Sequence, residues 1–199
     1  MIGATQAMKD PGGYITEQDV NKMIDACENE RDKLLLQVLA HTGRRITEVL
    51  MLTPGDIVPG NSGIMFTILK KRFVGDRPKR QKYVHPDLCL ALIGYSQRQN
   101  IGNSDRIFPF TRMTAFNIVR KSATKAGVTT VSHRPVHPHH FRHFFVVDKI
   151  KHAVKLEEAL QLRDYMEHSS IVITESYLHT DTERQKNIFK RENDDRNNG

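Results

Sequence analysis

The chain has 199 residues, of which 27% are charged, and a formal net charge of +7 at pH 7. The sequence has no run of about 18 apolar residues, so no membrane span is expected. Residues 1–13 lack the apolar stretch of a secretory signal. Cys27 and Cys89 lie in separate apolar helical patterns without metal-ligand spacing, so we expect free, buried thiols in a reducing cytoplasm. The positive charge favours a polyanionic partner, and nucleic acid is the commonest one.

Hydrophobic spacing and turn residues predict a mainly α fold with one small antiparallel β-sheet, which is the α+β class. Thr16 with Asp19 is typical of a helix N-terminus, and Gly43 and Gly127 are typical helix stops. Residues 14–180 are predicted to form one domain. The expected elements are, in chain order, an arm over residues 1–13, helices over 16–28, up to 43 and over 45–52, strands over 63–69 and 81–85, helices over 86–95, over 111–126, from 139, over 155–167 and over 173–179, and a tail over 181–199.

The predicted strand pair carries a dense cluster of basic residues, opposed only by Asp76. The cluster consists of Lys70, Lys71, Arg72, Arg77, Lys79, Arg80 and Lys82. A phosphate-binding surface and a solvated basic hairpin explain this cluster equally well. A lysine on a flexible turn can also protonate a departing oxygen, and Lys71 is the first candidate, followed by Lys70. For the other basic residues, Arg72, Lys79 and Arg80 among them, we expect contact with a nucleic-acid backbone or with solvent.

A second segment suited to phosphate binding runs from His41 to Glu48. Arg44 and Arg45 follow a glycine at the predicted start of a helix, where free N–H groups and the helix dipole favour an anion. A guanidinium can also bind two phosphate oxygens at once. The alternative is that both arginines are ordinary surface residues.

The third segment is the histidine-rich stretch from His137 to His143. His139 and Arg142 are three residues apart, so on a helix they share one face and place a proton donor or acceptor beside a fixed charge. His139 and His143 stand at helical spacing for a zinc site. No glutamate lies between them and no third ligand is evident, so a metal site is the weaker alternative.

The fourth segment runs from His168 to Tyr177, on a predicted short helix. A single tyrosine near a C-terminus is by itself usually a packed aromatic. Taken in order, however, the segments resemble the tyrosine recombinase family. TGRRITE is similar to the family's Thr-Gly-x-Arg-x-x-Glu segment, HHFRH to its His-x-x-Arg-His box, and HSSIVITESY to its histidine-to-tyrosine segment. The order and approximate positions agree from about Tyr14 to His179.

The resemblance implies that residues 14–180 are a catalytic domain that cleaves and rejoins DNA through a covalent 3′-phosphotyrosine. The implied roles are phosphate binding by Arg45 and Arg142, hydrogen bonding by His139 and His168, nucleophilic attack by Tyr177, protonation of the 5′-hydroxyl by Lys71, support by Glu48 and His143, and DNA contact by Arg44, Lys70, Arg72, Lys79 and Arg80. No metal and no other cofactor is implied. The implied partners are double-stranded DNA and further copies of the chain in a tetramer. Residues 181–199 are either a helix that links the protomers or a frayed terminus, and both interpretations stay open.

The chain departs from the family pattern at several places. Arg44 stands where the family often has an apolar residue, Glu167 stands where a glycine usually precedes the histidine, and the hairpin carries extra residues. The family's N-terminal DNA-clamping domain has no counterpart, so we expect a fragment. We expect it to act in the cytoplasm on the DNA of a virus, plasmid or prokaryotic host, as part of a mobile element. A type IB-like topoisomerase and a non-catalytic DNA-binding module remain the alternatives.

Overall fold

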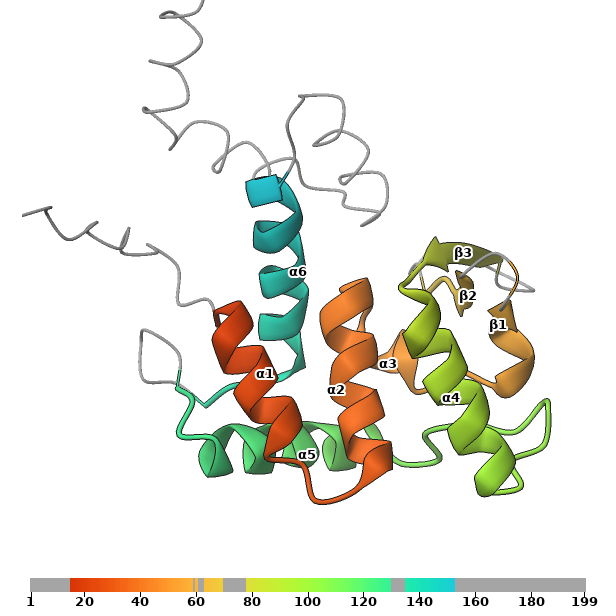
Figure 1. Ribbon diagram of the computed structural model, residues 1–199, viewed down its shortest axis with the longest axis horizontal. Helices are drawn as coiled ribbons and strands as arrows, with labels where there is room; N and C mark the ends of the chain where they lie inside the picture. Colours follow the sequence, from red (N-terminus) through yellow and green to blue (C-terminus); the bar gives the residue numbers. More distant parts are fainter. Residues whose placement is uncertain (1–14, 59, 61–62, 70–77, 130–134, 153–199) are drawn as a thin grey trace, which may run out of the picture. The chain divides into compact units, whose positions relative to one another are not determined.

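The computed structural model describes residues 15–58, 60, 63–69, 78–129 and 135–152. The chain divides into two compact units, residues 1–148 and 149–199, and the fold described here is that of the first. Its elements are the helices α1 (Glu17–Asp25), α2 (Glu30–Thr42), α3 (Ile46–Val49), α4 (Pro86–Arg98), α5 (Arg112–Lys125) and α6 (Pro138–His152), the 3-10 turn η1 (Pro54–Asp56), and the strands β1 (Ile57–Val58), β2 (Gly63–Thr67) and β3 (Lys79–Tyr83) (Figure 1). The strands form one antiparallel sheet in the order β1-β2-β3. The predicted class, mainly helical with one small antiparallel sheet, is confirmed.

Local chemistry sets the helix ends where the sequence predicts them. The Thr16 hydroxyl accepts a hydrogen bond of 3.1 Å from the Asp19 N–H, and the Asp19 carboxylate accepts one of 2.9 Å from the Thr16 N–H. These two bonds satisfy N–H groups that the first turn of α1 cannot pair. Gly43 ends α2 with φ 57°, and Gly127 follows α5 with φ 65°. Glycine is favoured in this left-handed conformation because it has no side chain to clash.

Several predicted boundaries are wrong. The helix expected over 45–52 is only four residues long, because the N–H groups of Met51 and Leu52 bond three residues back and tighten the chain into a turn. The second strand starts at Lys79 rather than Gln81, because the β2 ladder pairs Thr67 with Lys79. Helix α4 continues through Ser96 to Arg98, and the buried Ser96 hydroxyl is satisfied inside the helix by donating to the Leu92 carbonyl at 2.7 Å.

Two features at the ends of elements were also missed. The strand β1 has two residues, too few to show an alternating pattern. Cys27 lies beyond the last residue of α1 rather than on a helix, and it is only half-buried. Cys89 lies on α4 and is buried, and both thiols are free.

Within the residues that the structure describes, no helix is both long and apolar enough to cross a membrane.

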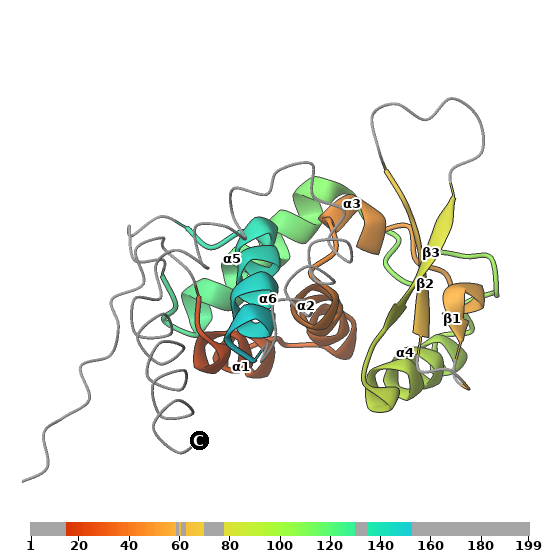
Figure 2. The same ribbon diagram turned by 90° about the horizontal axis from the view of Figure 1, so that it is seen from above.

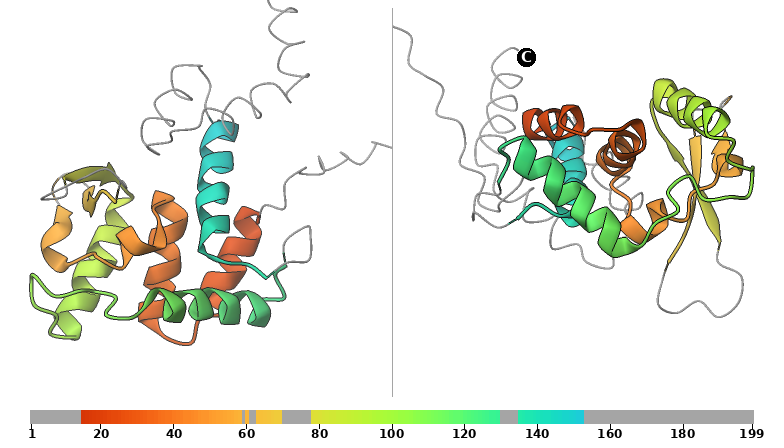
Figure 3. Two further views of the ribbon diagram at one scale, coloured as in Figure 1. Left: turned by 180° about the vertical axis from the view of Figure 1, so that it is seen from behind. Right: turned by 90° about the horizontal axis from the view of Figure 1, so that it is seen from below.

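The hydrophobic core is centred on α2. Leu35, Leu36, Val38 and Leu39 are 0% exposed, so this helix is apolar on almost its whole circumference and must be covered on several sides. Figures 1 and 3 show α5 running across the ends of α1 and α2. Helix α4 packs against the sheet (Figure 2).

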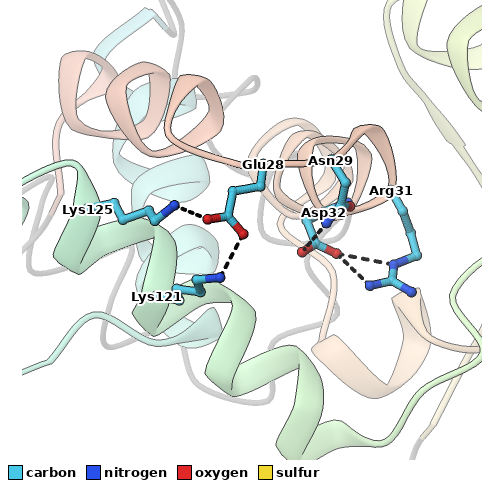
Figure 4. A network of polar contacts seen from close by, with 6 residues as sticks. All are labelled: Glu28, Asn29, Arg31, Asp32, Lys121 and Lys125. Atoms are coloured by element: carbon cyan, nitrogen blue, oxygen red, sulfur yellow. Dashed lines mark hydrogen bonds and ion pairs between the residues drawn. The ribbon is translucent and has the colours of Figure 1, made fainter.

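Charged side chains fix α5 to the turn between α1 and α2 (Figure 4). The Glu28 carboxylate accepts hydrogen bonds from Lys121, at 2.7 Å, and from Lys125. These bonds lower the Glu28 pKa to about 2. The hydroxyl of Ser122 donates to the Met23 carbonyl in the buried layer below. Both contacts hold α5 in place, and the first turn of this helix borders the candidate site.

Candidate functional site

A cavity of about 230 Å³ opens where the first residues of α3, α5 and α6 meet. We call it the arginine cavity. It is lined by Arg44, Arg45, Ile46, Thr47, Arg112, Pro138, His139 and Arg142. Three predicted catalytic residues, Arg45, His139 and Arg142, therefore lie around one hollow although they come from segments far apart in the sequence. Four of the lining residues are arginines and none is a carboxylate, so the hollow is suited to an anion.

Arg45 is held at the edge of the cavity by Glu48. Its Nη1 donates to Glu48 Oε1 at 3.1 Å, and its backbone N–H donates to Glu48 Oε2 at 3.0 Å. The Glu48 side chain is fully buried, whereas that of Arg45 is 36% exposed. One carboxylate thus orients both the backbone and the guanidinium of Arg45. Because a guanidinium has five N–H donors in all, the bond to Glu48 leaves other donors of Arg45 for a ligand. The supporting role of Glu48 in catalysis stays a prediction.

Arg44 takes a different position from its neighbour. Its side chain is 0% exposed, and its Nη1 lies 3.8 Å from the buried Glu48 Oε2. Because Arg44 also lines the cavity, any contact with DNA would have to be made from inside that hollow. Its assignment to DNA binding stays a prediction.

Arg142 reaches the cavity from α6. It is 7% exposed, and its Nη1 donates a 2.8 Å hydrogen bond to the Gly43 carbonyl. That carbonyl belongs to the residue that ends α2, two positions before Arg45. The bond joins the two segments that carry the predicted phosphate-binding arginines.

The histidines at the start of α6 favour the neutral form. Partial burial of the ring, followed by the neighbouring His137, His143, Arg142 and Arg112, lowers the pKa of His139. Burial and Arg142 likewise lower the pKa of His143, which is half-buried. A neutral imidazole donates through one nitrogen and accepts through the other. His139 can therefore hydrogen-bond a phosphate oxygen or accept a proton.

The zinc alternative gains no further ligand from the described part of the chain. Among those residues, no group of three or more His, Cys, Asp or Glu side chains could hold a metal ion. His139 and His143 are the two positions that the spacing had suggested.

The basic hairpin is more varied than its sequence indicated. Lys79 pairs with Asp56, Arg80 is exposed, and Lys82 is buried. One lysine of the cluster therefore packs inside the unit instead of facing solvent, because its strand position turns it inward. Lys70, Lys71 and Arg72 lie outside the described residues, so the general acid stays a prediction.

The remaining predicted catalytic residues, His168 and Tyr177, also lie outside the described residues, as do the arm at 1–13 and the tail at 181–199. Their roles stay predictions.

Sequence analysis did not select Arg112, although it lines the cavity. It is the first residue of α5, directly after the capping Thr111, whose hydroxyl accepts from the Thr114 N–H at 3.1 Å. An arginine at the start of a helix was the signal used for Arg45. Applied to α5, it would have found Arg112.

Comparison with known proteins gives consistent results. The model of the phage integrase family matches residues 13–184. Tyrosine recombinase XerD of Chlorobaculum tepidum is 29% identical over 168 residues, which cover 80% of this chain and 52% of that protein.

Solved structures show the same fold. The catalytic domain of bacteriophage HP1 integrase matches with a TM-score of 0.62 and 21% identity, covering 89% of this chain and 94% of that one. The XerH site-specific recombinase bound to its difH substrate matches with a TM-score of 0.69 and 17% identity, covering 92% of this chain and 55% of that one. The fold is thus that of integrase catalytic domains. The chain spans between half and two thirds of the length of the curated relatives it matches.

Proposed function

The chain belongs to the phage integrase family, and on this premise we propose that it is a site-specific DNA recombinase that cleaves and rejoins strands through a covalent 3′-phosphotyrosine at Tyr177. The observation that carries the proposal is the placement of Arg45, His139 and Arg142 around one cavity of about 230 Å³. Fixed cations around a hollow are the arrangement that stabilises a phosphorus centre as negative charge grows on it.

In the proposed reaction, Arg45 and Arg142 bind the non-bridging oxygens of one DNA phosphate. Each guanidinium is already held by a protein group, Arg45 by Glu48 and Arg142 by the Gly43 carbonyl. Little reorganisation is then needed when charge develops, and this preorganisation is a large source of rate enhancement. The fixed cations take the part that metal ions play in many nucleases, so the proposal requires no metal.

The bond changes follow from this placement. The Tyr177 oxygen attacks phosphorus, the bond from phosphorus to the 5′-oxygen breaks, and Lys71 donates a proton to that oxygen. The phenol proton passes to a neutral histidine, for which His139 and His168 are the proposed acceptors. Rejoining reverses these steps with a 5′-hydroxyl as nucleophile. Because the phosphotyrosine conserves the phosphodiester, the reaction requires no nucleotide cofactor.

A nicked DNA duplex that traps the covalent intermediate tests the proposal. The full chain in EDTA should form a protein–DNA adduct, and Tyr177→Phe should form none. Tyr83→Phe is the matched control, because Tyr83 is 74% exposed on β3, and it should behave as the wild type. An adduct that persists in Tyr177→Phe would place the nucleophile elsewhere. DNA binding without any wild-type adduct would leave a non-catalytic DNA-binding module.

The partners follow from the same proposal. Double-stranded DNA is the substrate, and residues 181–199 link protomers into a tetramer on it. A chain ending at Asp181 should then lose assembly on DNA, and equal assembly of the two chains would contradict the idea. Exchange between two DNA sites would distinguish a recombinase from a type IB-like topoisomerase, which would relax supercoils without exchanging partners.

A further inference from the structure

Arg112 lines the arginine cavity, and the proposed mechanism gives it no role. It is the first residue of α5 and is exposed. It lines the same hollow as Arg45, His139 and Arg142. A cavity of about 230 Å³ has room for one tetrahedral anion, and N–H donors bind an oxygen at about 3 Å.

A series of rings holds Arg112 at this place. Its guanidinium carbon lies 5.5 Å from the centroid of the Phe116 ring, one turn along α5, which is within the range of a cation–π interaction. Phe116 stacks on His137 at 6.0 Å with an interplanar angle of 12°. His137 in turn meets His139 edge-on at 6.1 Å. The rings connect the first turn of α5 to the start of α6.

Arg112 differs from two lysines of its own helix in its charge partners. Within the described part of the chain, no carboxylate forms an ion pair with it, whereas Lys121 and Lys125 on the same helix both pair with Glu28. Phe116 is half-buried and packs against the hydrophobic core. Arg112 is therefore an available cation whose position is set by a packed ring.

We propose that Arg112 binds the same DNA phosphate as Arg45 and Arg142, as a third guanidinium that Phe116 positions. The inference rests on the proposed function and adds to it a residue and the ring that orients it. Burial, the neighbouring histidines and Arg142 lower the pKa of His139, and the Arg112 charge adds to this effect. No bond is made or broken by Arg112, since its part is to offset charge.

The first test compares Arg112→Ala with Arg120→Ala, a matched control that removes an exposed arginine from the same helix. Arg112→Ala should slow adduct formation on the nicked duplex by about 10-fold or more, and Arg120→Ala should leave the rate unchanged. Phe116→Leu keeps an apolar side chain but removes the aromatic face, so it should slow the reaction in the same direction by a smaller factor.

A second substrate identifies the phosphate. In a methylphosphonate duplex, a methyl group replaces one non-bridging oxygen of the cleaved phosphate and removes its charge. The defect of Arg112→Ala should shrink on this substrate, because less charge remains to be offset. An equal defect on both substrates would place Arg112 on a neighbouring phosphate, and weakened DNA binding at an unchanged cleavage rate would make it a DNA contact away from the cleaved phosphate. Either result would overturn the inference.

A third measurement does not depend on cleavage. Inorganic phosphate should raise the thermal unfolding midpoint of the full chain by binding the folded state, and this rise should be smaller in Arg112→Ala than in Arg120→Ala. Should the wild type form no adduct, the proposed function fails, and the phosphate titration alone decides whether Arg112 belongs to an anion site. Equal rises in the two variants would overturn the inference.

Discussion

Two cavities of similar size border α5, and they differ in how their charges are balanced. The arginine cavity measures about 230 Å³ and the second about 240 Å³. The second, which we call the lysine cavity, is lined by Ala26, Cys27, Glu28, Asp32, Thr114, Asn117, Ile118, Lys121, Ser122 and Lys125. Its two lysines are bound by Glu28. In the arginine cavity, Arg44 and Arg45 both lie beside the buried carboxylate of Glu48, and none of the lining residues is a carboxylate. The carboxylates of Glu28 and Asp32 line the lysine cavity together with its lysines, whereas no carboxylate lines the arginine cavity, so the arginine cavity is the better suited of the two to an anion.

The largest expected difference between the cavities is in DNA cleavage. Arg45→Ala removes a preorganised donor from the proposed phosphate site and should lower the rate of adduct formation by about 10²- to 10³-fold. Lys125→Ala removes a charge of the same sign from the lysine cavity and should leave the rate unchanged. Single-turnover cleavage of the nicked duplex measures both. Cleavage by Arg45→Ala at the wild-type rate would remove the functional distinction between the two cavities.

The second difference is in stability. Glu48→Ala leaves the buried Arg44 guanidinium without its carboxylate neighbour and should reduce the free energy of unfolding by about 3 kcal/mol. Glu28→Ala breaks contacts that are exposed to solvent, and such surface pairs contribute little to stability. Urea denaturation of both variants gives the comparison. Equal losses in the free energy of unfolding would mean that burial does not make Glu48 more important for stability than Glu28.

The third difference concerns pH, because histidines occur beside the arginine cavity but not in the lining of the lysine cavity. Burial, reinforced by His137, lowers the His140 pKa from 6.5 to about 4. The unfolded chain therefore binds the proton more readily than the folded one, and stability falls as the pH drops from about 6.5 toward 4. After allowance for partial exposure, we expect a loss on the order of 1 kcal/mol between pH 7 and pH 5.

Unfolding experiments at several pH values measure this loss. His140→Gln should flatten the pH dependence, whereas His85→Gln should not, because the His85 side chain is 70% exposed. The same slope in His140→Gln and wild type would assign the effect to another group.

Features fixed by neighbouring residues were predictable from the sequence, and features fixed across the chain were not. Thr16, Gly43 and Gly127 mark helix ends through contacts within a few positions, and a sequence displays such contacts directly. The bond between Arg142 and the Gly43 carbonyl joins residues far apart in the chain, so only the fold reveals it.

The same distinction applies to the site. The i, i+3 spacing of His139 and Arg142 predicted a shared helix face, and both line the arginine cavity. The place of Arg112 in that cavity depends on how α5 crosses the domain, and its position after Thr111 gave only a local hint. Lys82 was counted as a surface charge because strand direction, which buries it, cannot be taken from a cluster of basic letters.

Gly43 has a further consequence for how this protein can change. Its left-handed backbone leads directly into Arg44 and Arg45, while its carbonyl oxygen anchors Arg142. Gly43, which has no side chain, thus influences the distance between the guanidinium groups of Arg45 and Arg142. Most other amino acids here would strain the backbone, and a shift of this peptide would move both groups together. A substitution of Arg45 or Arg142 changes one cationic group, whereas a substitution of Gly43 changes the distance between the two groups.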